Sequence, residues 1–245
     1  MFDPSMGMPL ELPSSLWGKT ATVQVDPNLA HFAGLAFGDG YPAWGEVRVV
    51  TSNSMFADRL TGIVHQIAAE CGGSSRVYVR PGEISDLPQH NIVLNSTLIR
   101  RALFHDTMRP RYDSIYSLMM DEALAPDVQG GLSDAEGSLL LPQPIEYPHG
   151  RIFAMYNGDR RLLGIARLSL VSKLKVEPSS VRTRLSSKKG RRHTVRGIEV
   201  VTRKNNYLIE ILSGGKRKWL DKVGRILWHP EKLERAKILL ATYSN

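Results

Sequence analysis

Cysteine is nearly absent from this 245-residue chain. The single one, Cys71, excludes an internal disulfide and a zinc site built from cysteine pairs. The seven histidines are scattered, without the His-x-His or His-x-x-x-His spacing of a histidine metal site. No apolar run approaches the roughly 20 residues that span a membrane, and the N-terminus does not resemble a secretory signal. We therefore expect an intracellular protein without membrane association, in the cytoplasm of a prokaryote or in an organelle.

Charge is distributed unevenly along the chain. The formal net charge is +8, yet residues 1–123 hold 9 Lys and Arg against 13 Asp and Glu, while residues 124–245 hold 23 against 11. The densest basic segment is 180–204, with 9 Lys and Arg and one acid, Glu199. A polyanionic partner such as nucleic acid would explain this distribution, with the C-terminal half making more of the phosphate contacts.

The same short pattern occurs twice in the chain. The first copy is residues 32–40 (FAGLAFGDG), and the second is residues 129–137 (QGGLSDAEG). Each is a helix-like run with small residues on one side, and each ends in an acid followed by glycine. This repeat predicts two similar half-domains that meet at a two-fold axis and contribute one carboxylate each.

The first copy has the features of a helix C-terminus. Asp26 is a favoured N-cap, Pro27 suits the first helical position, and Gly40 is predicted to stop the helix with a positive φ. Asp39 then lies in the last turn, where the negative end of the helix dipole disfavours an acid. Glu136 repeats this position in the second copy. We therefore expect the two acids to serve a purpose other than helix stability.

Small residues predict how the two helices pack. Ala33–Gly34 in the first copy matches Gly130–Gly131 in the second. Glycine inside a helix costs about 1 kcal/mol relative to alanine. Close packing of two helix backbones would explain why glycine is present despite this cost. Helices packed in this way would hold Asp39 and Glu136 side by side. Adjacent carboxylates repel one another and attract hard divalent cations such as Mg²⁺.

The pair of motifs resembles that of the single-chain LAGLIDADG homing endonucleases, which carry two copies ending in Asp-Gly or Glu-Gly. The resemblance is to the archaeal, intron-encoded type and covers most of residues 21–240. It includes the segments 47–53, 152–157, 207–212 and 229–232. Phe37 stands where the family has an acid in the middle of the first motif, and Gln129 opens the second. Neither position is that of the acid that binds metal in the family.

The resemblance implies an α+β fold of two pseudo-symmetric αββαββα half-domains. Their antiparallel four-stranded sheets would form a saddle over DNA, with the two motif helices packed at the centre. The expected divisions are an irregular N-terminal arm (1–20), a first half-domain (21–110), a linker with a bridging helix (111–125) and a second half-domain (126–245). The bridging helix is predicted around Ser114–Leu124.

The resemblance also implies a monomeric, metal-dependent endonuclease that cuts both strands of a long asymmetric DNA target. Asp39 and Glu136 would bind Mg²⁺, with Mn²⁺ or Ca²⁺ able to substitute for binding. Asn53 and Asn157, each at the end of a strand before a helix, would organise water near the metal or cap their helices. Lys216 is a candidate for the basic residue that the family places near the scissile phosphates.

Two alternatives use the same fold without cleavage. Some family members act as maturases that help an intron RNA to fold, and a DNA-binding regulator could keep the fold alone. Both acids are present in this chain, which favours cleavage but leaves a dual role open.

The DNA-contacting surface is predicted from strand parity and from charge. Arg182 and Arg184 are two residues apart and therefore point to one face of a strand. Arg76 and Arg80 share a face for the same reason. Arginines on a β-ribbon can read base edges in the major groove. The predicted DNA-binding residues are Arg48, Arg76, Arg80, Arg182, Arg184, Lys188, Lys189, Arg191, Arg192, Arg203 and Lys204.

Overall fold

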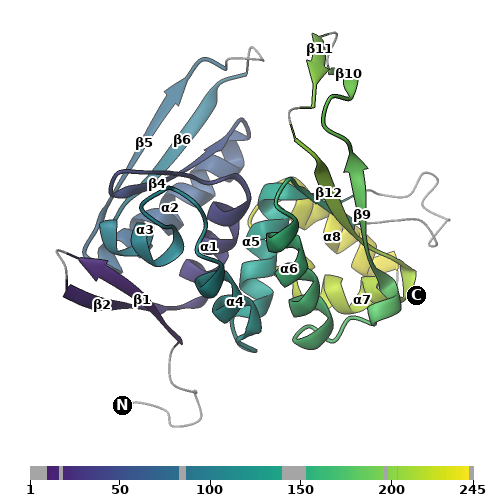
Figure 1. The fold of residues 1–245 in the computed structure, drawn as a ribbon, viewed down its shortest axis with the longest axis horizontal. Coiled ribbons are helices and arrows are strands. Elements are labelled where there is room, and N and C mark those ends of the chain that lie inside the picture. The colour runs from purple at the N-terminus through teal and green to yellow at the C-terminus, as the bar shows by residue number, and fades with distance from the viewer. Residues whose placement is uncertain are drawn as a thin grey trace.

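The structure, a computed structural model, describes residues 10–16, 19–82, 87–139, 153–195, 198–202 and 204–242. It is a mixed α+β fold with antiparallel sheets, which confirms the α+β part of the predicted fold class. Helices α1 (Pro27–Asp39) and α5 (Ala125–Glu136) lie side by side at the centre, with one sheet on either side of them (Figure 1).

The N-terminal half follows the predicted order of elements. After α1 come β3 (Tyr41–Ala43), β4 (Glu46–Thr51), α2 (Ser54–Glu70), β5 (Ser74–Arg80), β6 (Gln89–Asn95) and α3 (Thr97–Leu103). The sheet has the antiparallel strand order β3-β4-β6-β5. Alternation along β4 buries Val47 and Val49 and turns Arg48 to the other face. Helix α2 packs against β4, β5 and β6 on the buried face. Among the described elements, none of the helices lies over the face that carries Arg48 (Figure 1).

The C-terminal half begins with the second motif helix and repeats this plan. After α5 come β7 (Gly137–Leu139), β8 (Phe153–Asn157), α6 (Arg160–Ser172), η1 (Pro178–Ser180), β9 (Val181–Ser187), β10 (Arg192–Val195), β11 (Ile198–Val201), β12 (Asn206–Ile211), α7 (Ser213–Lys222), η2 (Gly224–Ile226) and α8 (Pro230–Thr242). Its sheet has the antiparallel order β7-β8-β12-β9. This order corresponds strand by strand to that of the first sheet.

Glycine allows the two motif helices to touch backbone to backbone. A Cβ on Gly34 would lie 2.2 Å from the carbonyl oxygen of Val128, and a Cβ on Gly131 would lie 1.8 Å from that of His31. Real Cβ atoms do not approach oxygen so closely, so neither position accepts a larger residue without a backbone shift. The predicted close packing through small residues is therefore confirmed.

The irregular N-terminal arm predicted over residues 1–20 is wrong for its second part. Two strands, β1 (Leu10–Leu16) and β2 (Lys19–Val25), pair antiparallel as the arms of an N-terminal hairpin. Leu12 and Val23 are buried in the core, and the Ser14 hydroxyl donates to the Leu98 carbonyl oxygen (2.8 Å). The strand alternation over residues 10–16 is masked in the sequence by Pro13, which is tolerated on an edge strand.

The bridging helix α4 (Tyr112–Met120) is shorter than predicted. The carboxylate of Asp121 accepts hydrogen bonds from the backbone N–H groups of Ala123 and Leu124. This turn ends α4 and leads into α5, which starts at residue 125 as a new helix.

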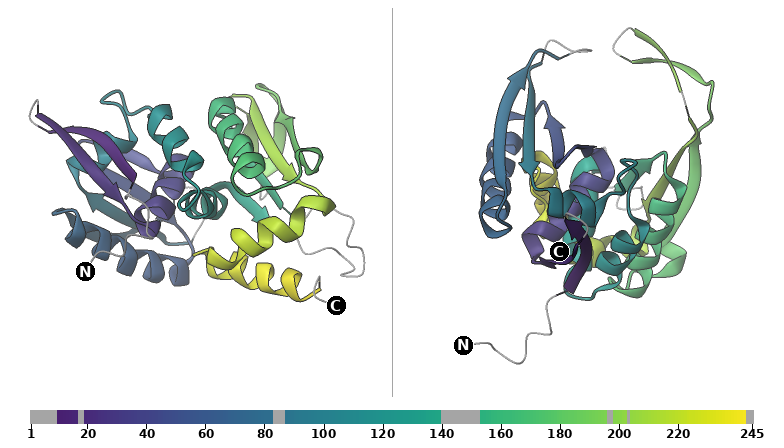
Figure 2. Two further views of the ribbon diagram at one scale, coloured as in Figure 1. Left: turned by 90° about the horizontal axis from the view of Figure 1, so that it is seen from below. Right: turned by 60° about the vertical axis from the view of Figure 1, so that its left-hand side comes forward.

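Two β-ribbons project to the same side of the molecule. One is β5–β6, and the other is β10–β11, whose strands pair only with each other (Figure 2, right). Within the described ranges, no helix is both long enough and apolar enough to cross a membrane.

Candidate functional site

Asp39 and Glu136 are the last residues of α1 and α5. The two helices run in the same direction, so these ends meet. A Cβ on Gly38 would lie 2.5 Å from the Cβ of Ala135 and 3.0 Å from the Cγ of Glu136. The close approach brings the two acids to one end of the helix pair, where the charge of Asp39 acts on Glu136.

The glycines after the acids do not adopt the positive φ predicted for them. Gly40 has φ −70° and Gly137 has φ −82°. Their role is steric, because a Cβ at either position would lie 2.3 Å from the carbonyl oxygen of Ala36 or of Ser133, respectively. Glycine thus lets the chain leave each helix sharply, immediately beyond the acid.

Both acids are held in a form that resists ionisation. Burial, and after it the charge of Asp39, raises the pKa of Glu136 to about 8. The hydrogen bond from Asn157 and the ammonium groups of Lys204 and Lys232 act in the opposite direction. Burial also raises the pKa of Asp39, against the charge of Lys232. Because the Glu136 pKa is raised this far, both acids can ionise together only when positive charge lies close to them.

Lys232, on α8, is a site residue that the sequence did not identify. Its ammonium group donates to the carbonyl oxygens of Ser133 (3.0 Å) and Asp134 (2.5 Å), in the last turn of α5. Positive charge is favourable at this end of a helix. Burial lowers the pKa of Lys232, while Asp134, Asp39 and Glu136 raise it. No sequence motif links residue 232 to acids so distant along the chain.

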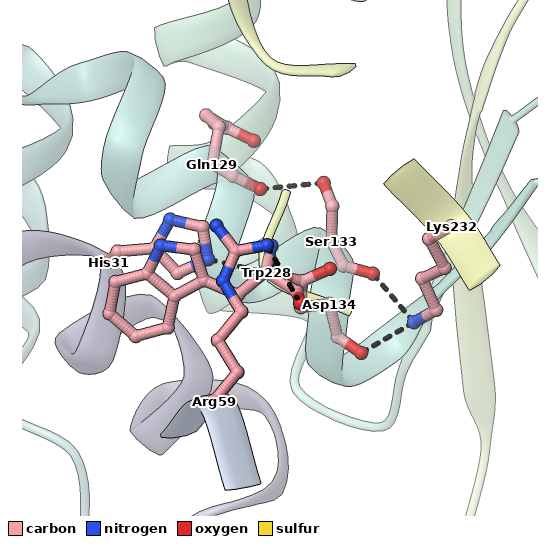
Figure 3. Close-up of polar contacts among 7 residues, drawn as sticks. All are labelled: His31, Arg59, Gln129, Ser133, Asp134, Trp228 and Lys232. Carbon is pink, nitrogen blue, oxygen red and sulfur yellow. Dashed lines mark hydrogen bonds and ion pairs between the residues drawn. The ribbon is translucent and has the colours of Figure 1, made fainter. Parts of the chain in front are cut away.

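Residues 228–232, which we call the C-terminal clasp, join the two halves beside the acids. The indole of Trp228 stacks on the His31 ring of α1, with ring centroids 3.8 Å apart, and the backbone N–H of Trp228 donates to the Asp134 carboxylate of α5 (2.6 Å). His31 also donates to Asp134 (2.9 Å), and Arg59 of α2 donates to the Trp228 carbonyl oxygen (3.4 Å). Figure 3 shows these side chains gathered around Asp134.

The two predicted asparagines do not occupy equivalent places. Asn53 is the N-cap of α2, since its side chain accepts from the Phe56 N–H (2.9 Å). The N-cap of α6 is Asp159 instead. Asn157 lies two residues earlier, at the end of β8, and its amide donates to the Glu136 carboxylate (2.5 Å). Only Asn157 therefore contacts an acid of the site.

Each acid borders its own cavity. Glu136, Asn157 and Lys204 line one of about 570 Å³. The Lys204 side chain crosses Gly158, where a Cβ would lie 2.4 Å from its Cε. Asp39 and Lys232 line another, of about 250 Å³.

Lys216, the predicted basic residue of the site, lies elsewhere. It is fully buried on α7, and burial lowers its pKa. It lines neither of these two cavities. Lys204 and Lys232 are the lysines whose charge acts on Glu136. Lys216 was a candidate only by its position in the family resemblance, which does not show that this side chain points into the core.

The predicted arginines lie on the uncovered faces of the two sheets. On the first sheet, Arg48 lies over the rings of Tyr41 and Tyr78, while Arg76 and Arg80 also approach Tyr78. On the second sheet, helix α6 packs against β8, β9 and β12. The exposed Arg182 and Arg184 lie on the face opposite the buried Val181.

The basic ribbon of the second half lies beyond its sheet. Lys188, Lys189, Arg191 and Arg192 are exposed around the turn between β9 and β10, with Gly190 at φ 85°. The predicted contact Arg203 falls outside the described residues.

The two acids form a pair that could hold a divalent cation. No cluster of three or more His, Cys, Asp or Glu able to hold a metal occurs in the described part of the chain. Mg²⁺ commonly uses only one or two carboxylates and completes its coordination with water and phosphate oxygens. Asp39 and Glu136 supply such a pair, and a cation between them would relieve the repulsion that raises the Glu136 pKa.

The chain matches no model of a protein family, and no curated protein matches it.

Proposed function

We propose that this chain is a metal-dependent, site-specific DNA endonuclease with two LAGLIDADG-like half-domains. The observation that carries the proposal is the pair of acids, Asp39 and Glu136, at the ends of two helices in backbone contact. An acid at a helix C-terminus is unfavourable, and this chain has two at matching positions.

A pseudo-two-fold axis between α1 and α5 is supported by their glycine contacts. Gly34 faces the carbonyl oxygen of Val128 and the amide nitrogen of Leu132. Gly131 faces the same two groups of His31 and Leu35, at the same offsets in sequence. Around this axis the sheets would form a saddle, flanked by the ribbons that project to one side (Figure 2). The uncovered arginines and the basic ribbon would then contact opposite ends of a DNA duplex.

Each residue of the site has a distinct proposed role. Asp39 and Glu136 would hold Mg²⁺, which supplies Lewis-acid activation of water and neutralises charge on the leaving oxygen. Asn157 orients the Glu136 carboxylate through its amide hydrogen bond. Lys204 presents an ammonium group in the Glu136 cavity, where a phosphate would enter. Lys232 holds the last turn of α5 and partly neutralises the acids.

Two acids on a pseudo-two-fold axis would allow one cut in each DNA strand. The halves differ in charge and in strand length, so the target need not be palindromic. A monomer would therefore suffice to cleave an asymmetric double-stranded site.

A plasmid library with a randomised insert tests the proposal whatever the target sequence is. With Mg²⁺, the wild-type protein is expected to linearise a subset of the library. Asp39→Asn and Glu136→Gln should each keep DNA binding and lose double-strand cleavage. Glu234→Gln is the matched control, because it removes one negative charge from an exposed ion pair with Lys237 on α8.

Three outcomes would count against the proposal. Cleavage that survives both acid substitutions would refute the role of the acids. A wild-type protein that binds selected DNA or intron RNA without cutting would be a binding protein or a maturase on the same fold. A protein that binds neither would overturn the proposal entirely.

A further inference from the structure

Each uncovered sheet face carries one well-buried glutamate. On the first sheet, Glu46 accepts from Arg48 (3.1 Å) through one carboxylate oxygen and from Arg76 (2.7 Å) through the other. The Glu46 side chain is 12% exposed, whereas that of Arg76 is 56% exposed. The carboxylate thus lies beneath two guanidinium groups and holds both from below.

The second sheet has a comparable pair. Glu210 accepts from Arg184 through two parallel bonds, Nε to Oε2 (3.1 Å) and Nη2 to Oε1 (2.9 Å). The Glu210 side chain is 10% exposed and that of Arg184 is 56% exposed. The two glutamates occupy non-corresponding strands, β4 and β12, so the repeat alone does not account for both.

An acid on a DNA-facing surface weakens binding to phosphates, so its presence needs a reason. Stability is a weak reason for it, since Arg76 and Arg184 are more than half exposed and ion pairs with exposed arginines contribute only about 0–1 kcal/mol. Orientation is a better one, because a guanidinium held by a carboxylate loses little freedom when it meets a base.

The hydrogen-bond geometry leaves the arginines able to read DNA. Arginine has five N–H donors, and Glu210 uses two of them on the Nε–Nη2 side of Arg184. The Nη1–Nη2 edge still offers two parallel donors. Two parallel donors match the O6 and N7 acceptors that guanine presents in the major groove.

We propose that Glu46 and Glu210 are specificity-determining residues, which fix Arg48, Arg76 and Arg184 for guanine recognition and oppose binding to unrelated DNA. This inference rests on the proposed function. The glutamates act through the arginines and are therefore positioning residues.

Binding selection from a randomised DNA duplex pool, with Ca²⁺ in place of Mg²⁺, tests the inference. Glu46→Gln should lower the preference for guanine about tenfold at positions in one half of the selected site, and Glu210→Gln at positions in the other half. Binding to unselected DNA should rise severalfold in each variant. Each half-site serves as the internal control for the other.

Further variants separate orientation from simple charge. Glu234→Gln removes the same charge away from the sheets and should leave the selected sequences unchanged. Arg184→Lys keeps the charge but loses the paired donors, so it should reproduce the Glu210→Gln profile. Thermal unfolding identifies a variant that has merely lost its fold, and Arg184→Lys then decides the case for the second sheet.

The outcomes distinguish this inference from the proposed function. If the wild-type protein selects no sequence, the proposed function fails. If wild type and Glu234→Gln select one profile and both Glu46→Gln and Glu210→Gln keep it, only the role of the glutamates is overturned.

Discussion

The two halves share a backbone plan but differ in what surrounds each acid. Asp39 borders a small cavity with Lys232 from the C-terminal clasp. Glu136 borders a larger one with Asn157 and Lys204 from its own half. The contrast indicates that the packing of α1 against α5 fixes the positions of the two acids. The side chains around each acid differ between the halves.

The uncovered faces differ in the same way. The first sheet combines Arg48 and Arg76 with the rings of Tyr41 and Tyr78. The second half adds a separate basic ribbon, which the first half lacks in the described residues. In the proposed function, the acids on the paired helices would cut both DNA strands. The two sheet faces, which differ in their side chains, would recognise different sequences.

The largest effect is expected at the contact between α1 and α5. Alanine substitutions there test whether the two motif glycines contribute equally to the stability of the fold. Gly34→Ala and Gly131→Ala should each destabilise the fold by about 1–3 kcal/mol or more, because the added Cβ meets a backbone oxygen. Gly164→Ala is the control, since nothing lies within 4 Å of its Cβ position, and it should stabilise α6 by up to about 1 kcal/mol. Urea unfolding measures all three, and a cost at only one motif glycine would contradict the matched geometry.

The basic ribbon should account for much of the difference in DNA affinity between the halves. Replacing Lys188, Lys189, Arg191 and Arg192 with alanine should weaken binding and flatten the plot of log K against log salt, by up to about 0.9 for each phosphate that the protein no longer neutralises. Binding measured across a salt series checks this. An unchanged slope would show that the ribbon does not touch the DNA backbone.

The two asparagines offer a test of local asymmetry at the acids. Asn157→Ala removes the hydrogen bond to Glu136 and should slow cleavage of one strand by about tenfold, so that nicked plasmid accumulates. Asn53→Ala removes a helix N-cap and should cost about 1 kcal/mol of stability without a strand bias. Equal slowing of both strands by Asn157→Ala would sink the distinction.

The last prediction concerns how the ionisation of Glu136 makes the stability of the protein depend on pH. Its folded-state pKa of about 8 exceeds the ordinary 4.5, so the folded protein binds more protons than the unfolded chain between these values. Wild type should therefore lose stability as pH rises through this interval. Glu136→Gln does not ionise, so it should be more stable than wild type above pH 8, and its advantage should grow as pH rises between about 4.5 and 8. Urea unfolding at several pH values measures the difference, and a gain that does not vary with pH would argue against an ionising Glu136.

Local features allowed much of this fold to be predicted. The helix ends at Asp39 and Glu136 and the glycine contacts follow from patterns within short segments, whereas the two four-stranded sheets were implied by the family resemblance. The N-terminal hairpin was missed because Pro13 interrupts an otherwise regular alternation. The equivalence of Asn53 and Asn157 failed because a two-residue offset at a strand end decides which group caps the helix.

The site was harder to predict because its groups come from distant segments. Lys232 and Trp228 reach α1 and α5 only through the fold of the whole second half. Lys216 was misplaced because the family resemblance gives only an approximate position along the chain and does not show which side chains pack inward. Tertiary packing, rather than any local rule, determines these positions.

The clasp has a consequence for the order in which the protein is made. Residues 228–232 are synthesised after every segment they connect, namely the helices that carry His31, Arg59 and Asp134. Until residues 228–232 leave the ribosome, the Trp228 indole cannot stack on His31 and Lys232 cannot donate to the last turn of α5. The nascent chain thus completes the surroundings of its acids only after residue 232 has been made.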